Sequence, residues 1–191
     1  MIEFKSIISG IEADLRQYEL ALEIFGGTDQ KSSPTNRRSK APVRVLLTGV
    51  PIVHGAERVL ELIEDAGAVV VAMENCTGLK PILEDVDEDA PDPIRAIADK
   101  YFHLPCSVMT PNRRRLDLLK QLACEFRVAC VIELVWQACL TYDVETSHVR
   151  RLVERELGIP YLRIETDYSP SDSARIALRV EALFETVRQR G

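Results

Sequence analysis

The stretch Val131-Ile-Glu-Leu-Val-Trp-Gln-Ala-Cys139-Leu-Thr-Tyr-Asp143 decides the fold that we expect for this chain. It belongs to a β-branched, apolar run over residues 128–136, which leads to a cysteine and then to polar residues where a helical pattern begins. Such a run between two helical patterns is typical of a strand buried on both faces of a parallel sheet. Ligands of open α/β sheets bind beyond the carboxyl ends of the strands, so we expect Cys139 on the functional edge.

The rest of the chain repeats this alternation of strand and helix. Strands are predicted over residues 43–49, 68–76, 128–136 and 160–167, and the segment 104–110 is a candidate for a fifth. Helices are predicted over residues 56–66, 92–102, 112–127, 145–157 and 173–190. Alternation of this kind implies parallel strands joined by right-handed crossovers. The sequence therefore predicts a three-layer α/β domain with a sheet of four or five mainly parallel strands.

Three segments of different character divide the chain. Residues 1–27 space their apolar side chains as an amphipathic helix does, and Gly26-Gly27 ends the pattern. Residues 28–42 are rich in Ser, Lys and Arg and contain two prolines, which is typical of a flexible linker. Residues 43–191 carry the strand and helix patterns. We expect an N-terminal helix, a linker and one compact domain.

Composition limits the classes of function. A hydrophobic content of 46% and a charged content of 28% are ordinary for a soluble globular protein, and no apolar run has the length of a membrane span. The first residues lack the layout of a signal peptide, so we expect a cytoplasmic protein without membrane contact. A net charge of -6 argues against nucleic acid as a partner. The basic cluster Arg113-Arg-Arg115 is interpreted as the solvated first turn of a helix.

Five cysteines are present, and in a reducing compartment they do not indicate a disulfide framework. Cys124 falls in a helical pattern and Cys130 early in a strand, so both are expected in the core. Cys76, Cys106 and Cys139 stand at element ends beside polar residues, and a parallel sheet would bring them to one edge. Thiolates there suit an iron–sulfur cluster or zinc, although without a CxxC pair a compact zinc knuckle is not favoured. Three unrelated buried thiols are the alternative interpretation.

Other polar residues are expected near the same edge. His54, in the loop over residues 49–55, is either an acid–base group or a hydrogen-bonded structural residue. The glycine spacing of that loop matches neither nucleotide-binding pattern. Glu74, Glu165 and Asp167 stand at or near strand ends, where they would bind a polar group of a substrate or cap neighbouring helices.

Four stretches resemble a known family. They are Glu74-Asn-Cys76-Thr-Gly78, Leu104-Pro-Cys106-Ser-Val-Met-Thr-Pro-Asn112 with Arg115, Gln137-Ala-Cys139-Leu-Thr-Tyr142-Asp-Val-Glu145, and Ile159-Pro-Tyr-Leu-Arg-Ile-Glu165-Thr-Asp167-Tyr-Ser169. Together they resemble the C-terminal domain of the 2-hydroxyacyl-CoA dehydratase family, which also includes benzoyl-CoA reductase subunits and double-cubane cluster proteins. The resemblance covers the chain from Val43 onward and looks nearest to the double-cubane branch.

The resemblance implies a flavodoxin-like domain and a cysteine-bound [4Fe-4S] or double-cubane iron–sulfur cluster, with Cys139 as the most secure ligand and Cys76 and Cys106 beside it. It also implies electrons from a separate ATP-dependent activator. With them, dehydratase members make a ketyl radical on an acyl-CoA substrate, and related members carry out low-potential reductions. His54, Glu74 and Glu165 are the candidates for substrate binding.

The departures from the family pattern point to a partner. Family members are much longer, and their N-terminal domain supplies further cluster cysteines and part of the substrate pocket. Val50 and Leu140 stand where many relatives have a cysteine and a histidine. We therefore expect another dehydratase-family subunit or a second copy of this chain to complete an iron–sulfur lyase or reductase. A cluster-free relative that acts as a binding or assembly module is the alternative, and a zinc protein is a third interpretation.

Overall fold

The computed structural model describes residues 41–190 and the residue pairs 15–16, 19–20 and 22–23. The three pairs are helical and fall within the predicted N-terminal helix, whose other residues lie outside the described part, as do residues 28–40 of the predicted linker. The chain divides into two units, Met1–Lys40 and Ala41–Gly191, and the description below concerns the second unit by itself. The boundaries at residues 27 and 42 stay predictions.

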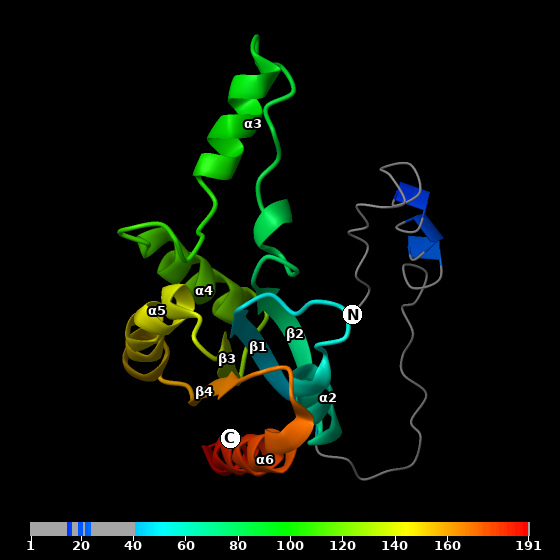
Figure 1. The fold of residues 1–191 in the computed structure, drawn as a ribbon, viewed down its shortest axis with the longest axis vertical. Helices are drawn as coiled ribbons and strands as arrows, with labels where there is room; N and C mark the ends of the chain where they lie inside the picture. The colour runs from blue at the N-terminus through cyan, green and yellow to red at the C-terminus, as the bar shows by residue number, and fades with distance from the viewer. Residues whose placement is uncertain (1–14, 17–18, 21, 24–40, 191) are drawn as a thin grey trace. The chain divides into compact units, whose positions relative to one another are not determined.

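The described residues form a four-stranded parallel sheet with the strand order β2-β1-β3-β4 (Figure 1). Its strands are β1 (Val43–Gly49), β2 (Ala68–Glu74), β3 (Cys130–Trp136) and β4 (Tyr161–Thr166). The predicted three-layer, flavodoxin-like α/β architecture is confirmed. The candidate fifth strand at residues 104–110 is wrong: this described segment forms turns, in which Cys106 donates to the Leu104 carbonyl and Met109 donates to the Cys106 carbonyl. Pro105 and Pro111 lack the N–H donors that a strand ladder needs.

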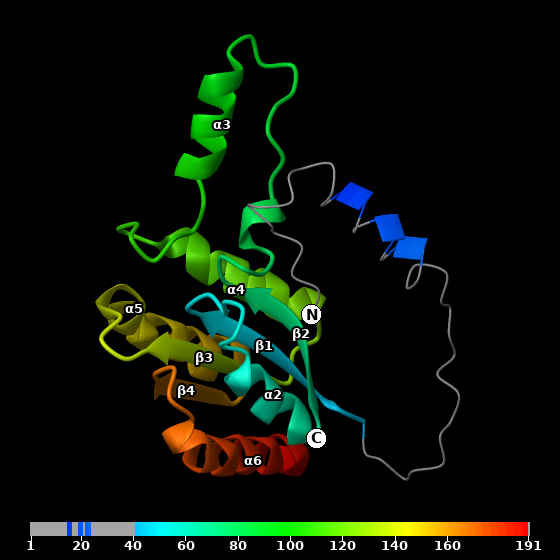
Figure 2. The same cartoon turned by 45° about the vertical axis from the view of Figure 1, so that its right-hand side comes forward.

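Helices cover both faces of the sheet because its central strands are apolar on both sides (Figure 2). Val45 and Leu47 of β1 pack with α2 (Arg58–Asp65) and α6 (Ser173–Arg190). Leu46 points to the other face and packs with α4 (Arg113–Glu125), α5 (Leu140–Arg151) and the π-helical turn η2 (Leu152–Leu157). The alternation of side chains along one strand therefore supplies two separate core clusters.

Glycines end two of the helices as the sequence predicts. Gly67 follows α2 with φ 86°, and Gly158 follows η2 with φ 68°, a left-handed conformation that favours glycine. One expectation about a helix start was wrong. The helix predicted from residue 145 begins at Leu140. Asn112 precedes α4 but, among the described residues, its side chain makes no cap bond and instead donates to the Cys106 carbonyl and to Glu145.

An arm rises from the carboxyl edge of the sheet between β2 and α4 (Figure 1). We call residues 83–103 the arm. It follows the short helix η1 (Lys80–Ile82), ascends through the acidic loop, and returns through α3 (Pro93–Phe102). The Asp92 side chain accepts hydrogen bonds from the backbone N–H groups of Ile94 and Arg95, each 3.1 Å long, which fixes the start of α3.

The C-terminal part of the chain completes the second helical layer. After β4, the short helix η3 (Pro170–Asp172) leads directly into α6. Asp172 contacts Arg58 of α2 at 2.7 Å, so η3 is joined to the helix beside it. Within the described residues, none of the helices combines the length and the apolar character that crossing a membrane would require.

Candidate functional site

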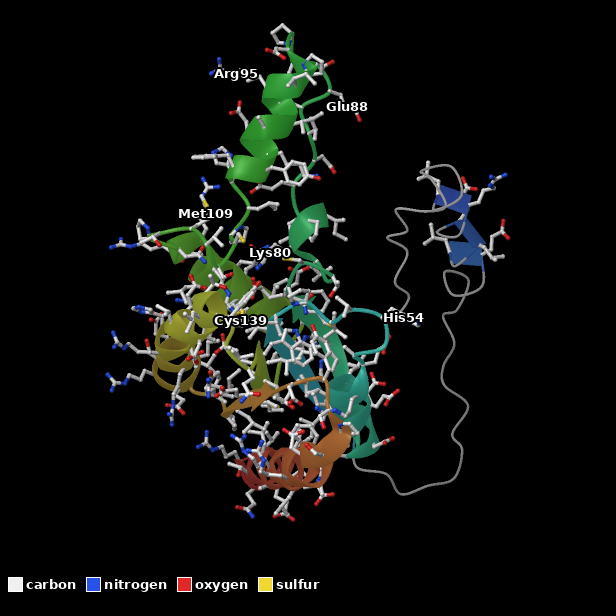
Figure 3. All side chains as sticks on the ribbon, viewed as in Figure 1. His54, Lys80, Glu88, Arg95, Met109 and Cys139 are labelled. Carbon is white, nitrogen blue, oxygen red and sulfur yellow. The ribbon has the colours of Figure 1, made fainter. Side chains whose placement is uncertain are left out.

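The three singled-out cysteines lie at the carboxyl edge of the sheet or in the turn below the arm. Cys76 follows β2 and is exposed, while Cys139 occupies the cap position of α5 after β3 and is half-buried. Cys106 is half-buried in the turn between α3 and α4. Figure 3 shows Cys139 and Lys80 in the region where the arm joins the sheet. The Cys76 and Cys139 loops follow β2 and β3, which both pair with β1, while the Cys106 turn is joined to this region through side chains.

A buried arginine stands at the centre of this region. Arg115, in the first turn of α4, is 1% exposed and makes ion pairs with Glu74 (3.1 Å), Glu133 (3.2 Å) and Glu145 (2.6 Å). It also donates to the Thr48 hydroxyl at 3.0 Å. These partners come from β2, β3, α5 and β1, so one guanidinium joins four elements. Burial alone would lower the pKa of Arg115, but the three carboxylates raise it above its ordinary value.

A second buried cation completes the group. Lys80 Nζ lies 2.6 Å from Glu74 Oε1, and both residues are almost completely buried. The other oxygen of Glu74 accepts from Arg115 and from the Thr48 hydroxyl. We call Glu74, Lys80, Arg115, Glu133 and Glu145 the ion cluster. Buried carboxylates persist only when cations and hydrogen bonds satisfy them. Here Oε2 of Glu74 accepts hydrogen bonds, whereas Oε1 has the ion-pair contact with Lys80 but no aligned hydrogen bond.

Glu133 is the carboxylate of the cluster that burial affects most clearly. Desolvation raises the pKa of Glu133, while Arg115 and a hydrogen bond from the Tyr161 hydroxyl act in the opposite direction. Burial and the nearby Glu133 charge raise the pKa of Tyr161 in turn, so this hydroxyl keeps its proton and acts as the donor. The cluster thus extends from β3 to the edge strand β4.

The ion cluster is connected to all three cysteine segments. Glu74 stands two residues before Cys76 in the chain. The Asn112 amide bridges Glu145 (2.7 Å) and the Cys106 carbonyl (2.8 Å). The side chains of the cluster therefore tie the Cys76 and Cys106 segments to one buried centre.

Tyr142 connects the Cys139 segment to the ion cluster. It follows Cys139 by three residues, at the start of α5. Its buried ring lies under the Arg115 guanidinium at 5.0 Å and the Lys80 ammonium at 5.9 Å. Burial first, and then the negative charge of Cys76, raise the pKa of Tyr142. The Cys76 side chain is thus close enough to act electrostatically on a residue of the Cys139 segment.

The turn that carries Cys76 is fixed by its neighbours. The Asn75 side chain accepts from the backbone N–H and the hydroxyl of Thr77, each at 3.1 Å. A Cβ atom added at Gly78 would lie 2.2 Å from the Met73 carbonyl oxygen, which is closer than any real Cβ contact. The Asn-Cys-Thr-Gly sequence therefore closes a tight turn that holds Cys76 at the surface.

The three candidate substrate-binding residues lie in different places. Glu74 is 0% exposed and contacts protein cations rather than solvent. The His54 side chain is fully exposed, with Nδ1 3.3 Å from Glu57. Glu165 is exposed at the end of β4 and pairs with Arg163 at 2.9 Å. The structure therefore brings only Glu74 to the ion cluster, and the substrate-binding role of all three stays a prediction.

Sequence reasoning missed most of the ion cluster. Arg113 and Arg114 are exposed as expected, but the interpretation of Arg115 as a solvated residue is wrong. A signal was available, because Arg115 lies three and seven residues before the buried Leu118 and Leu122, on the same face of the helix. For Lys80, Glu133 and Glu145 the local pattern carried no comparable signal, since their partners come from other elements.

The remaining cysteines gave one correct and one wrong prediction. Cys130 is buried in β3 as expected, and burial raises the pKa of its thiol to about 12. Cys124 is exposed, which contradicts its expected place in the core. Leu118, Leu119 and Leu122 lie on the buried side of α4. Cys124, two residues after Leu122, lies on the side of the helix that faces solvent.

A recess with partly apolar walls lies beside the Cys106 segment. It has a volume of about 460 Å³ and runs between the first turn of α4 and the middle of α5. Apolar side chains of Met109, Leu116 and Val144 line it together with polar groups of Arg115, Glu145 and His148. The recess therefore places one side of the ion cluster next to a space that could receive a small group.

The donor chemistry of the three cysteines fits thiolate ligation of an iron–sulfur cluster, since none of the three thiols is buried: Cys76 is exposed, and Cys106 and Cys139 are partly exposed. In residues 41–190 and the three described helical pairs, no group of three or more His, Cys, Asp or Glu side chains is arranged to hold a metal ion. Their role as cluster ligands therefore stays a prediction.

Comparison with known proteins gives the family. Residues 5–187 match the family described as 2-hydroxyglutaryl-CoA dehydratase, D-component. YjiM of Escherichia coli (strain K12), a protein provisionally named a dehydratase subunit, is 44% identical over 142 residues, which are 74% of this chain and 37% of that protein. The chain thus spans little more than a third of this curated relative. On the extent of the match, the chain belongs to the 2-hydroxyglutaryl-CoA dehydratase D-component family, as its sequence motifs predict.

Proposed function

We propose that this chain is the iron–sulfur subunit of a 2-hydroxyacyl-CoA dehydratase-type enzyme and that Cys76, Cys106 and Cys139 are ligands of its cluster. The family supports the dehydratase part of the proposal. The observation that carries the ligand assignment is the connection of the three cysteine segments to one buried ion cluster. When bound, a [4Fe-4S] or double-cubane cluster would supply low-potential electron transfer, with an ATP-dependent activator as the electron source.

The residues of this chain would hold the site in shape. Arg115 connects the ends of β1 and β2 to the middle of β3 and to the second turn of α5, so these elements keep a fixed spacing. The tight turn at Gly78 presents Cys76 at the surface. A cubane cluster takes about four protein ligands. Because three cysteines are assigned here, a further ligand would come from another dehydratase-family subunit or from a second copy of this chain.

Anaerobic reconstitution tests the proposal. The full chain, alone and with a partner subunit, is incubated with iron and sulfide, and bound iron, bound sulfide and the electron paramagnetic resonance spectrum of the reduced sample are measured. We expect Cys76→Ser, Cys106→Ser and Cys139→Ser each to lower bound iron. Cys124→Ser is the matched control, because Cys124 is exposed on α4 and belongs to none of the three segments. Unchanged iron content in the triple variant would reject the assignment.

A cluster-free assembly module is the second candidate function. Two observations favour it: Val50, where many relatives have a cysteine, is buried in the core, and the described residues contain no ready-made metal site. In this case the triple cysteine variant would still assemble with its partner subunit, and no iron would be bound in the complex. Metal analysis of protein purified without oxygen also separates both candidates from a zinc protein.

A further inference from the structure

The buried hydroxyl group of Tyr142, at the start of α5, is a hydrogen-bond donor that the ion cluster does not use. Tyr142 is 5% exposed, and among the described residues no group is aligned to bond its Oη atom. Three further buried side-chain atoms share this property, but each belongs to an ion pair: Glu74 Oε1 and Lys80 Nζ lie 2.6 Å apart, and the Arg163 guanidinium contacts carboxylates through Nη2. Buried hydroxyls are normally paired, so this exception points to a partner outside the polypeptide.

The neighbours of the Tyr142 ring hold this hydroxyl in one place. The ring belongs to a buried core cluster of the sheet. The Arg115 guanidinium lies 5.0 Å and the Lys80 ammonium 5.9 Å from its centroid, so two cations of the ion cluster pack on it. Lys80 follows Cys76 by four residues, and the buried Glu74 contacts both cations. The ring is therefore held beside the turn of Cys76.

The three cysteine segments meet at the Tyr142 hydroxyl. Tyr142 itself follows Cys139 by three residues. The charge of Cys76 raises the pKa of Tyr142, second only to burial, and charges act in this way mainly within about 6 Å. Ser107, the residue after Cys106, lowers the same pKa, although its hydroxyl is not aligned as a hydrogen bond. One donor thus lies near residues of all three segments.

A donor in this position has a defined effect on an iron–sulfur centre. Sulfur atoms of bound thiolates accept hydrogen bonds, and these bonds help to set the reduction potential of the centre. The reduced state carries one more negative charge than the oxidised state, so a donor stabilises the reduced state more. A buried donor acts more strongly than an exposed one, because water competes less for it.

We propose that the Tyr142 hydroxyl donates a hydrogen bond to the Cys76 sulfur when Cys76 holds the iron–sulfur cluster, and that this bond raises the reduction potential of the cluster. The inference rests on the function proposed above, in which Cys76 is a ligand. Tyr142 acts through Cys76, so it is a positioning residue and not a ligand. The cations that pack on its ring keep the donor in place.

The first test is the midpoint potential of the reconstituted protein, measured by redox titration and electron paramagnetic resonance. Tyr142→Phe should keep the bound iron and sulfide but shift the one-electron equilibrium constant about tenfold toward the oxidised state, which lowers the potential by about 59 mV. Tyr168→Phe is the matched control, because it removes the same atom from a ring that is 68% exposed and stacks on Trp136 at 4.7 Å. Its potential should equal that of the wild type.

Two failures are distinguishable in this test. A wild type that binds no iron would overturn the proposed function, and the role of Tyr142 with it. A wild type and a Tyr142→Phe variant that bind equal iron at equal potential would overturn the role of Tyr142 alone.

The second test strengthens the donor instead of removing it, and it applies even if Tyr142→Phe loses iron. 3-Fluorotyrosine at position 142 has nearly the same shape and a more acidic hydroxyl, so the potential should rise above that of the wild type. A potential that stays the same or falls would overturn the proposal. Electron nuclear double resonance in deuterated water should also show an exchangeable proton coupled to the wild-type cluster. The same proton signal in Tyr142→Phe would assign the bond to water and overturn the proposal.

Discussion

At the scale of single residues, Arg115 determines how three acidic side chains are kept in the interior. Glu74, Glu133 and Glu145 all contact its guanidinium, and only Lys80 adds a second positive charge to the group. A carboxylate that loses its partner inside a protein keeps the full cost of leaving water. The arginine therefore matters for stability because of what its removal would leave behind.

Arg115→Ala should lower the free energy of unfolding by about 3–5 kcal/mol, the usual loss when one partner of a buried ion pair is removed. Urea denaturation followed by circular dichroism measures this change. Arg113→Ala is the matched control on the same helical turn; its exposed side chain should change stability by less than about 0.5 kcal/mol. Equal stabilities of the two variants would show that the ion cluster contributes nothing to the free energy of unfolding.

Glu133 gives a pH dependence. Its pKa in the folded protein is raised above the ordinary value of 4.5, chiefly by burial, so folding binds a proton and the stabilising effect is complete below the ordinary value. This stabilisation is lost as the pH rises through the raised pKa of Glu133. We expect the stability of the wild type relative to Glu133→Gln to fall as the pH increases from below 4.5. The measurement is the free energy of unfolding of both proteins across this pH range. A stability difference that rises with pH would contradict the raised pKa of Glu133.

At the scale of elements, turns and helix starts position the Cys76 and Cys106 segments, which the strands alone do not place. The turn after β2 closes with Asn75 and Thr77, and Gly78 lies against the Met73 carbonyl. The Asn112 side chain joins the turn of Cys106 to α5 instead of capping α4. These hydrogen bonds and close contacts fix the position of each loop relative to the elements around it.

Gly78→Ala should be more destabilising than a glycine replacement that meets no neighbour. The new methyl group would overlap the Met73 carbonyl, and overpacking of this kind costs about 1–3 kcal/mol. At Gly55 no atom lies within 4 Å of an added Cβ, so Gly55→Ala carries only the strain of its positive φ, about 1 kcal/mol. Thermal and urea unfolding compare the two variants. If Gly55→Ala proved the more harmful, the tight turn would not be a constraint.

The sequence predicts elements well where local patterns decide them. The apolar runs of β1 and β3 are buried on both faces, and this is why their strands could be recognised without knowing their neighbours. The segment around Cys106 was harder, because its residues suit a strand while Pro105 and Pro111 remove the donors that a ladder needs.

The ion cluster was beyond local reasoning. Its contacts join residues that are 18, 30 and 41 positions apart, so no pattern within one element shows them. Arg115 could have been recognised from its place on the buried side of α4, but Lys80 could not, because its only signal is a partner on β2. The cysteine positions came from strand ends, and the family motif supplied their grouping.

At the scale of the whole domain, stability is distributed unevenly. β1 and β3 lie in the middle of the sheet between two helical layers, whereas the arm has no buried residue in its described helix. A segment with so few apolar contacts opens easily unless a second molecule covers it. The domain thus combines a firmly packed sheet with one weakly held projection.

Hydrogen–deuterium exchange should show this contrast. Amides of α3 should exchange at least about a hundredfold faster than those of β3, because only local opening is needed to expose them. Mass spectrometry of peptic fragments resolves both regions. Equal protection of α3 and β3 would contradict the prediction.

The buried cluster also has a consequence for how the domain assembles. Its acidic members sit on separate strands and on α5, and they become tolerable inside only when α4 has brought its arginine between them. A half-built sheet would enclose repelling anions and gain little from its apolar contacts. Partly folded forms are thereby penalised, and the chain should pass from unfolded to native in a single cooperative transition.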